Sequence, residues 1–336
     1  MRRPSPARPR TGAARRPAVT VAAFVVVLAL AAFAAWLGVG FVAADRLTRP
    51  ERRFDASQHP GTYGASYRDV TLTTRDGLAI AAWHLPSPGA GDAGTGDAGA
   101  GPVVGGAGVV LVHGHESSRT WEFYQGFPAL AAALQANGYH VVMIDLRGHG
   151  ESGGERFSFG HLERYDVMAA VDLLLAEGVP PGRVGVLGVS MGAATAIGAA
   201  ADDPRIGALW ADSGYADIRP IIEARWPSAS GLPMAFLRGT LLAHRLRFGF
   251  DLGGVRPEDE IVRVPPRPIQ LVHGTADVTV PYEHAQRLAA ASGAGLWTLP
   301  GVAHAAIYPG DPGAYTARVV DFFDLALRTD LAQAGR

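Results

Sequence analysis

The sequence predicts an α/β protein with a mostly parallel central sheet and helices on both of its faces. From residue 109 onwards, short apolar runs typical of buried strands alternate with longer segments of helical periodicity, which is the pattern of a parallel sheet. Of the 336 residues, 48% are apolar, enough to fill one large core. An uncharged apolar stretch near the N-terminus stands apart and predicts one membrane helix.

The N-terminal region combines a basic segment with an apolar one. Residues 1–17 hold six arginines among prolines and alanines, a composition that predicts a disordered tail. Residues 18–44 carry no charge, and about 20 apolar residues suffice to cross a bilayer. We therefore expect a transmembrane helix over 18–44 and a linker over 45–66. A cleaved signal peptide is the alternative, because Val42-Ala43-Ala44 is a tolerable cleavage site.

Arginines on the two sides of the apolar stretch set the expected topology. The six ahead of it face no acid, whereas the four that follow it are mixed with Asp45 and Glu51. The positive-inside bias then places the N-terminus in the cytoplasm and the body of the chain outside, held at the cell membrane by a single span. If the stretch were cleaved, the body would be secreted.

The body of the chain, expected over 67–330, opens with a hairpin and an insertion. Alternating residues over 67–74 and 78–85 flank a turn that reads Arg-Asp-Gly, which predicts two antiparallel strands. Residues 86–108 are almost entirely Gly, Ala, Pro, Asp and Thr. This composition predicts a flexible surface loop.

Strands and helices then alternate along the chain. The expected strands are 109–112, 139–144, 184–187, 206–210, 269–272 and 296–299. The expected helices are 127–136, 162–176, 193–200, 282–291 and 315–327. Between 215 and 264 the alternation lapses and apolar residues fall on one helical face in each of two segments, which predicts a small helical cap. The alternative is that these apolar faces pack directly on the main sheet.

The segment Gly188-Val189-Ser190-Met191-Gly192 lies between a predicted strand and a predicted helix. A serine hydroxyl is a poor nucleophile, and a sharp strand-to-helix turn exposes it where a base can take its proton. Glycines at both ends of the turn avoid collisions with the neighbouring strand and helix. Strand and helix together are the context that this motif requires, so Ser190 is the candidate nucleophile, and an ordinary glycine turn is the alternative.

Four further segments, taken together with this motif, carry a resemblance to a known family. They are His113-Gly114, Asp145-Leu146-Arg147-Gly148-His149-Gly150-Glu151-Ser152, His273-Gly274-Thr275-Ala276-Asp277 with Val280-Pro281, and Gly301-Val302-Ala303-His304. Over most of residues 67–327 the chain resembles the α/β-hydrolase superfamily, and it is most similar to bacterial serine hydrolases of the acyl-esterase and serine-aminopeptidase-like branch, many of them membrane-anchored. The resemblance implies an α/β-hydrolase fold and a loop-bracing role for Asp145.

A nucleophilic serine needs a base, and the base needs an orienting carboxylate. In this fold the three follow in the order Ser, Asp or Glu, and His. Asp277 and His304 each lie in a loop just past a predicted strand, at the edge where an open α/β sheet gathers its site. Asp212 is the alternative acid. His113 and His273 precede glycines at strand ends and are expected to be structural.

The oxyanion of a tetrahedral intermediate needs hydrogen-bond donors. Met191 is expected to supply one backbone N–H, because it follows the nucleophile at the start of a helix. The second is expected from the loop after the first core strand, most simply from His115, with Glu116 as the alternative. The string His113-x-His115-Glu116 also suggests a metal site, but beyond its two histidines no third-ligand pattern lies nearby, so we expect neither metal nor cofactor.

These residues predict a serine hydrolase that acts on a small-molecule, acyl or peptidyl substrate and forms an acyl-enzyme on an ester, thioester or amide. A serine peptidase of the same fold and a non-catalytic membrane-tethered binding protein are the alternatives. The chain has no cysteine, which excludes a cysteine nucleophile. Six of its 30 basic residues precede Asp45, so the remainder is acidic and offers no basic footprint for nucleic acid.

Overall fold

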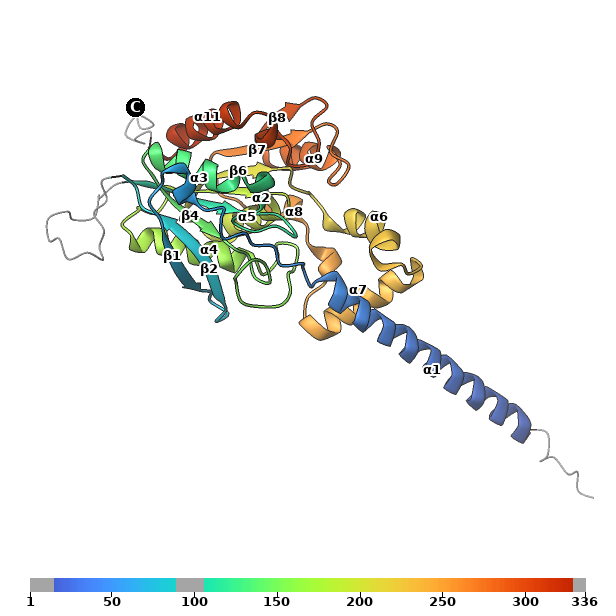
Figure 1. Cartoon of the computed structure of the whole chain (residues 1–336). Helices are drawn as coiled ribbons and strands as arrows, with labels where there is room; N and C mark the ends of the chain where they lie inside the picture. Colours follow the sequence, from blue (N-terminus) through green and yellow to red (C-terminus); the bar gives the residue numbers. More distant parts are fainter. Residues whose placement is uncertain (1–14, 89–105, 329–336) are drawn as a thin grey trace, which may run out of the picture. The chain divides into compact units, whose positions relative to one another are not determined.

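The structure is a computed structural model that describes residues 15–88 and 106–328 (Figure 1). The expected mostly parallel sheet with helices on both faces is confirmed. Of the expected basic tail over 1–17, the first 14 residues lie outside the described part of the chain. So do residues 89–105 of the expected insertion over 86–108.

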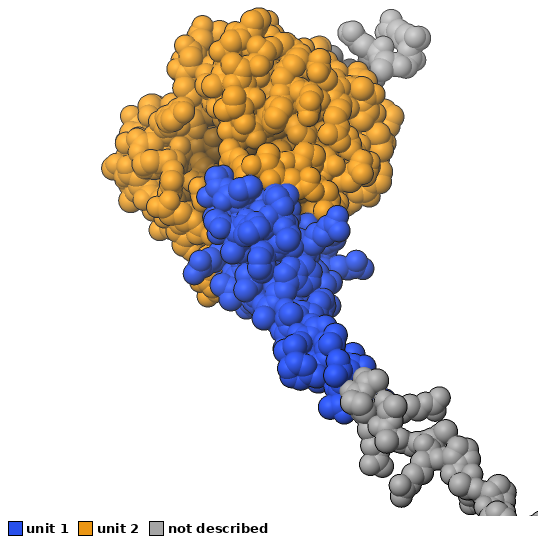
Figure 2. Space-filling view, turned by 90° about the vertical axis from the view of Figure 1, so that its right-hand side faces the viewer, with its two compact units in different colours: residues 1–46, 226–251 blue, residues 47–225, 252–336 orange. Residues whose placement is uncertain are grey.

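The chain divides into two compact units, which are coloured separately in Figure 2. The first unit contains the N-terminal helix up to Arg46 together with Trp226–Asp251. The second contains Leu47–Arg225 and the part from Leu252 onwards. The middle of the expected cap over 215–264 therefore groups with the N-terminal helix.

The first unit is built from helices. Helix α1 (Arg15–Leu47) has 33 residues and contains the expected span over 18–44. An 18-residue window of its stretch Val19–Leu47 has a mean hydropathy of 2.5, and the stretch is long and apolar enough to cross a membrane, a property that a signal sequence near the N-terminus shares. Helix α6 (Ile218–Ser230) ends in this unit, and α7 (Ala235–Phe248) lies within it.

The second unit is organised around an eight-stranded sheet. Its strands are β1 (Arg68–Thr73), β2 (Ala79–Leu85), β3 (Ala107–Val112), β4 (Tyr139–Ile144), β5 (Val184–Val189), β6 (Ile206–Asp212), β7 (Ile269–Gly274) and β8 (Gly295–Leu299). Their order is β1-β2-β4-β3-β5-β6-β7-β8. The expected opening hairpin is confirmed: β1 pairs antiparallel with β2, β2 pairs antiparallel with β4, and the remaining pairs are parallel.

Helices cover both faces of this sheet. The helical segments of the second unit are η1 (Pro60–Tyr63), α2 (Glu122–Gln125), α3 (Phe127–Ala136), α4 (Arg164–Ala176), α5 (Met191–Asp202), η2 (Leu252–Gly254), α8 (Pro257–Ile261), α9 (Glu283–Ser292), α10 (Ile307–Gly310), α11 (Pro312–Phe323) and a π turn, η3 (Asp324–Arg328). A Cβ added at Gly108 would meet Leu174 of α4, whereas the neighbouring Val109 belongs to the same buried apolar cluster as Phe127 of α3 and Tyr315 of α11. Because successive strand residues point to opposite faces, α3 and α11 cover one face and α4 covers the other.

Local sequence explains where these elements begin and end. Helix α3 carries a proline in its first turn, where a missing N–H costs nothing, and Gly138 follows it with a φ of 84°. All six residues of β5 are buried, as expected for a central parallel strand. Gly185 in that strand leaves room for the ring of Phe323, which a Cβ would approach to 2.4 Å.

From Leu47 onwards, the expected linker over 45–66 belongs to the second unit and packs within it. The carbonyl oxygen of buried Thr48 accepts a hydrogen bond from the N–H of Phe157 at 2.9 Å. The guanidinium of Arg52 donates to the carbonyl oxygens of Gly150 and Ser152 at 3.1 and 2.7 Å. These contacts join residues about a hundred positions apart, so no local pattern in the linker predicted them.

Candidate active site

Ser190 lies at a strained turn between β5 and α5. Its φ is 55° and its ψ is −116°, a backbone conformation that L-residues rarely adopt. A Cβ at Gly188 would lie 2.2 Å from the carbonyl oxygen of Gly192, and a Cβ at Gly192 would lie 2.3 Å from that of Val112. The turn is fixed by a hydrogen bond from the Ser190 N–H to the carbonyl of Asp212 at 2.8 Å. Both glycines are therefore required by close backbone contacts.

The structure brings three of the expected site residues together. Nε2 of His304 lies 2.9 Å from Oγ of Ser190, and Nδ1 of His304 lies 2.6 Å from Oδ2 of Asp277. These residues come from the loops that follow β5, β7 and β8, at the carboxyl edge of the parallel strands. Ser190, His304 and Asp277 thus form one continuous chain of hydrogen bonds.

The surroundings of Asp277 keep its carboxyl group ionised. Burial opposes ionisation, but hydrogen bonds from His273, His304 and the backbone N–H of Val280 outweigh it and hold the pKa of Asp277 well below its usual range. An ionised carboxylate can only accept hydrogen bonds. Nδ1 of His304 therefore carries the hydrogen, and Nε2 is left to accept one from the Ser190 hydroxyl.

His273 was expected to be structural, and the structure places it against the same carboxylate. Its Nε2 lies 3.2 Å from Oδ2 of Asp277 and 2.8 Å from the carbonyl oxygen of Val280. Both partners are acceptors, so Nε2 carries the hydrogen. His273 thus supplies a second donor to Asp277, a contact that its position before a glycine at the end of β7 did not reveal.

Asp212, the alternative acid, makes different contacts. Its carboxylate accepts hydrogen bonds from the hydroxyls of Ser213 at 2.8 Å and Tyr315 at 2.9 Å. Burial raises the pKa of Asp212 to about 6, although these hydrogen bonds act in the opposite direction. The Ser213 hydroxyl in turn accepts from the N–H of Ala305 at 3.2 Å. Asp212 therefore supports the loop that carries His304, while Asp277 contacts the imidazole itself.

Backbone donors lie on both sides of the serine. Met191 is the first residue of α5, where an N–H has no partner within the helix. In the described part of the chain, the N–H groups of Met191 and His115 donate to no protein acceptor. The N–H of Glu116, the alternative donor, points at Nε2 of His149 at 3.4 Å. Of the two candidates after β3, His115 is thus the one with an available N–H.

A buried glutamate that the sequence did not single out holds this loop. Oε2 of Glu122 accepts the N–H of Gly114 at 2.7 Å. Gly114 lies directly beside the nucleophile, since a Cβ added there would lie 3.1 Å from Cβ of Ser190. Burial raises the pKa of Glu122, and only 7% of its surface is exposed. Glu122 therefore orients the peptide that immediately precedes the expected oxyanion donor His115.

His113 uses both of its ring nitrogens within the protein. Nδ1 donates to the carbonyl oxygen of Gly114 at 2.7 Å, and Nε2 accepts the N–H of Leu146 at 2.9 Å. Burial lowers the pKa of His113 to about 4, which keeps the ring neutral. Within residues 15–88 and 106–328, no group of three or more His, Asp or Glu side chains is arranged to hold a metal ion.

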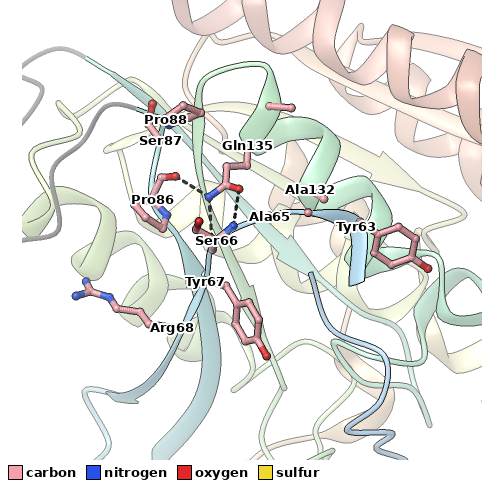
Figure 3. Close-up of a pocket in the computed structure, with 12 residues that line it drawn as sticks. Tyr63, Ala65, Ser66, Tyr67, Arg68, Pro86, Ser87, Pro88, Ala132 and Gln135 are labelled. Carbon is pink, nitrogen blue, oxygen red and sulfur yellow. Dashed lines mark hydrogen bonds between the residues drawn. The ribbon is translucent and has the colours of Figure 1, made fainter. Parts of the chain in front are cut away.

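A cavity of about 550 Å³ lies elsewhere on the second unit (Figure 3). The side-chain amide of Gln135 donates to the carbonyl oxygens of Ser66 and Pro86 in its wall, both at 2.8 Å. Leu85, at the end of β2, pairs with Val141 in the first half of β4, so this cavity lies at the amino edge of the parallel strands. Ser190 lies past the carboxyl edge, and none of the site residues lines the cavity.

Comparisons with known proteins agree with this architecture. The model of the family described as "Alpha/beta hydrolase family" matches residues 109–319. The uncharacterised protein Rv2307c of Mycobacterium tuberculosis is 28% identical over 256 residues, which are 75% of this chain and 76% of that protein. The Pyrococcus furiosus esterase Pf2001 superimposes with a TM-score of 0.65 and 25% identity, covering 83% of this chain and 98% of the esterase.

A peptidase shares the fold as well. The puromycin-hydrolysing peptidase of Mycobacterium tuberculosis superimposes with a TM-score of 0.60 and 21% identity, over 79% of this chain and 40% of the peptidase. The family match extends over more than half of the chain and spans the segments that carry Ser190, Asp277 and His304. The protein described above therefore belongs to the α/β-hydrolase family.

Proposed function

We propose that this protein is a membrane-anchored serine hydrolase that cleaves an ester, thioester or amide through an acyl-enzyme on Ser190. The observation that carries the proposal is the hydrogen-bonded chain from Ser190 through His304 to Asp277, with separations of 2.9 and 2.6 Å. Nucleophile, base and orienting carboxylate within such reach are the signature of an activated serine. The esterase and the peptidase that share the fold support hydrolysis as the reaction class.

In the first half of the reaction, His304 acts as the base. Its Nε2 takes the proton of the Ser190 hydroxyl while Oγ attacks the carbonyl carbon of the substrate. The imidazolium that forms is stabilised by ionised Asp277, whose own position is held by His273. The carbonyl oxygen becomes an oxyanion, and we assign its donors to the backbone N–H groups of Met191 and His115.

The intermediate then collapses and expels the leaving group, which takes the proton from Nε2 of His304. The bond between the acyl carbon and Ser190 Oγ remains, so the product of this half-reaction is an acyl-enzyme. Water deacylates it by the same route, giving its proton to His304 and restoring the free serine. No cofactor or metal is needed for either half.

Labelling and substrate series test this proposal. The full chain is expected to react with a fluorophosphonate probe and to hydrolyse nitrophenyl esters, with a rate that depends on acyl-chain length. Nitrophenyl thioesters and aminoacyl anilides, assayed in parallel, separate thioesterase and peptidase activity from esterase activity. A chain that is neither labelled nor active on any of the three substrate classes would favour the non-catalytic binding protein instead.

Glu122→Gln is expected to lower kcat about tenfold to a hundredfold and to leave KM nearly unchanged. The change removes the charge that holds the Gly114 peptide and therefore loosens the neighbouring His115 N–H, which acts mainly on the transition state. Steady-state kinetics on a nitrophenyl ester measure both constants. Glu116→Gln is the matched control, because the exposed Glu116 side chain makes no bond to Gly114. Equal effects of the two variants would contradict the positioning role of Glu122.

The membrane topology is tested by protease treatment of intact bacterial spheroplasts that express the full chain. The second unit is expected to be digested without lysis, because six arginines precede the span and no acid opposes them. Full protection of this unit until lysis would reverse the orientation. Mass spectrometry of the mature N-terminus distinguishes the signal-peptide alternative, in which the chain would begin at Asp45.

A further inference from the structure

The surroundings of α1 change at Trp36. Every side chain from Val19 to Ala35 is exposed, whereas Trp36 is partly buried and Gly40 is buried. A helix over 19–35 is about 25 Å long, which approaches the thickness of about 30 Å of a bilayer's hydrocarbon core. Trp36 is therefore the first residue of the described apolar stretch at which α1 is packed against another part of the chain, although Val39 and Val42 beyond it are still exposed.

Helix α7 begins beside this residue, within the same unit. The indole N–H of Trp36 donates to the carbonyl oxygen of Ala235 at 3.0 Å. A Cβ added at Gly40 would lie 2.6 Å from the carbonyl oxygen of Gly239. The two helix backbones approach closely through these glycines, as small residues allow in helix pairs at membranes.

The two helices run in the same direction. Asp45, near the end of α1, forms an ion pair with Arg247, near the end of α7, at 3.4 Å. The order of contacts is thus the same along both helices, from Trp36 with Ala235 to Asp45 with Arg247. The turn that precedes α7, residues 231–234, therefore lies level with the last residues of the uninterrupted exposed segment 19–35 of α1.

This turn and the first turn of α7 form an apolar tip. Residues 231–237 read Gly-Leu-Pro-Met-Ala-Phe-Leu without a charge, and Arg238 follows them. Met234 is 46% exposed. The turn is held in shape by the buried Trp226, whose indole N–H donates to the carbonyl oxygen of Pro233 at 3.2 Å. We call residues 231–236 the tip. It is held in one shape by the chain itself and presents the exposed Met234.

We propose that the tip inserts into the interfacial region of the phospholipid bilayer that α1 crosses. The inference rests on the proposed membrane anchor and adds a second lipid contact to it. Trp36, beside the tip, is the residue type enriched at membrane interfaces. Arg238 directly follows the apolar residues 231–237. Its guanidinium can reach lipid phosphates while the aliphatic part of its side chain stays in apolar surroundings. The partner of this surface is therefore a lipid surface.

Single-cysteine labelling of the full chain tests the inference, because the chain has no cysteine of its own. An environment-sensitive fluorophore is attached at Met234→Cys, Leu246→Cys or Val26→Cys. Each variant is reconstituted in phosphatidylcholine–phosphatidylglycerol vesicles with or without brominated acyl chains. Leu246 is the matched control, since it is 62% exposed and lies in α7, about 18 Å further along the helix axis than Met234, which directly precedes that helix. Quenching by brominated lipid is expected to be several-fold stronger at Met234 than at Leu246.

The three positions separate the possible failures. Strong quenching at Val26 with equal, weak quenching at Met234 and Leu246 would overturn the inference and leave the anchor standing. No quenching at Val26 would overturn the anchor itself, and the inference with it. Energy transfer between labelled copies at Met234 without quenching by brominated lipid would show that a second copy of the chain covers the tip, which also overturns the inference.

Discussion

Ser190→Ala is expected to abolish both ester hydrolysis and fluorophosphonate labelling. The substitution removes the only atom that bonds to the acyl carbon, and loss of a serine nucleophile typically lowers kcat by about 10⁶. Active-site labelling and steady-state kinetics on purified protein measure the two effects. Because the alanine keeps the Cβ and the backbone, far-UV circular dichroism and the unfolding midpoint should match those of the unmodified protein. Retained labelling would remove Ser190 from the mechanism.

The strained backbone at Ser190 gives this experiment a second readout. With φ at 55° and ψ at −116°, a residue with a side chain carries about 1–3 kcal/mol of strain. Glycine adopts this conformation without strain but loses more chain entropy on folding, by about 0.5–1 kcal/mol. Ser190→Gly should therefore be inactive and more stable than Ser190→Ala by about 1 kcal/mol in chemical unfolding. Equal stabilities would contradict the strain argument.

Strongly local signals account for the parts of the fold that the sequence predicted. The bounds of β4 and α3 coincide with the expected ranges 139–144 and 127–136. Each is a run of one periodicity that ends at a turn signal, and Asn137-Gly138 both ends the helix and begins the approach to the strand. Central parallel strands are buried on both faces, so their apolar runs are hard to mistake.

Elements whose packing or conformation depends on residues far away in the sequence could not be predicted from local signals. Helical periodicity between 215 and 264 indicated two apolar faces, but α1, which contacts α7, lies about 200 residues away, as the bond between Trp36 and Ala235 shows. Helix α2 is a left-handed turn in which Phe123, Tyr124 and Gln125 all have a positive φ. None of these residues is a type that favours this conformation, so no propensity signalled it.

For the candidate site, chain order and strand ends indicated which residues to examine. Ser190, Asp277 and His304 were expected because each follows a predicted strand, and the carboxyl ends of parallel strands lie along one edge. Glu122 was not singled out, and His273 was expected only to be structural, because a glutamate in a loop and a histidine before a glycine are common patterns. Their contacts depend on side-chain directions that only the folded chain defines.

Asp277→Asn is expected to lower kcat by about 10⁴. The amide oxygen can still accept the N–H groups of Thr279 and Val280, each at 2.8 Å, so the loop should keep its shape. The amide NH₂ would face Nδ1 of His304 and can only donate to it. This favours the tautomer with the hydrogen on Nε2, which cannot accept the proton of Ser190. The kcat from steady-state kinetics and the rate of fluorophosphonate labelling should fall together.

Asp212→Asn is the matched control, because it makes the same chemical change in a second buried carboxyl group of the site. The hydroxyls of Ser213 and Tyr315, which now donate to Asp212, can also accept, so the asparagine can keep its buried hydrogen bonds. The substitution leaves the contact between His304 and Asp277 in place and should lower kcat far less than Asp277→Asn. A larger loss from Asp212→Asn, in protein with an unchanged unfolding midpoint, would assign the orienting carboxylate to the end of β6, because only that carboxylate sets the tautomer of His304.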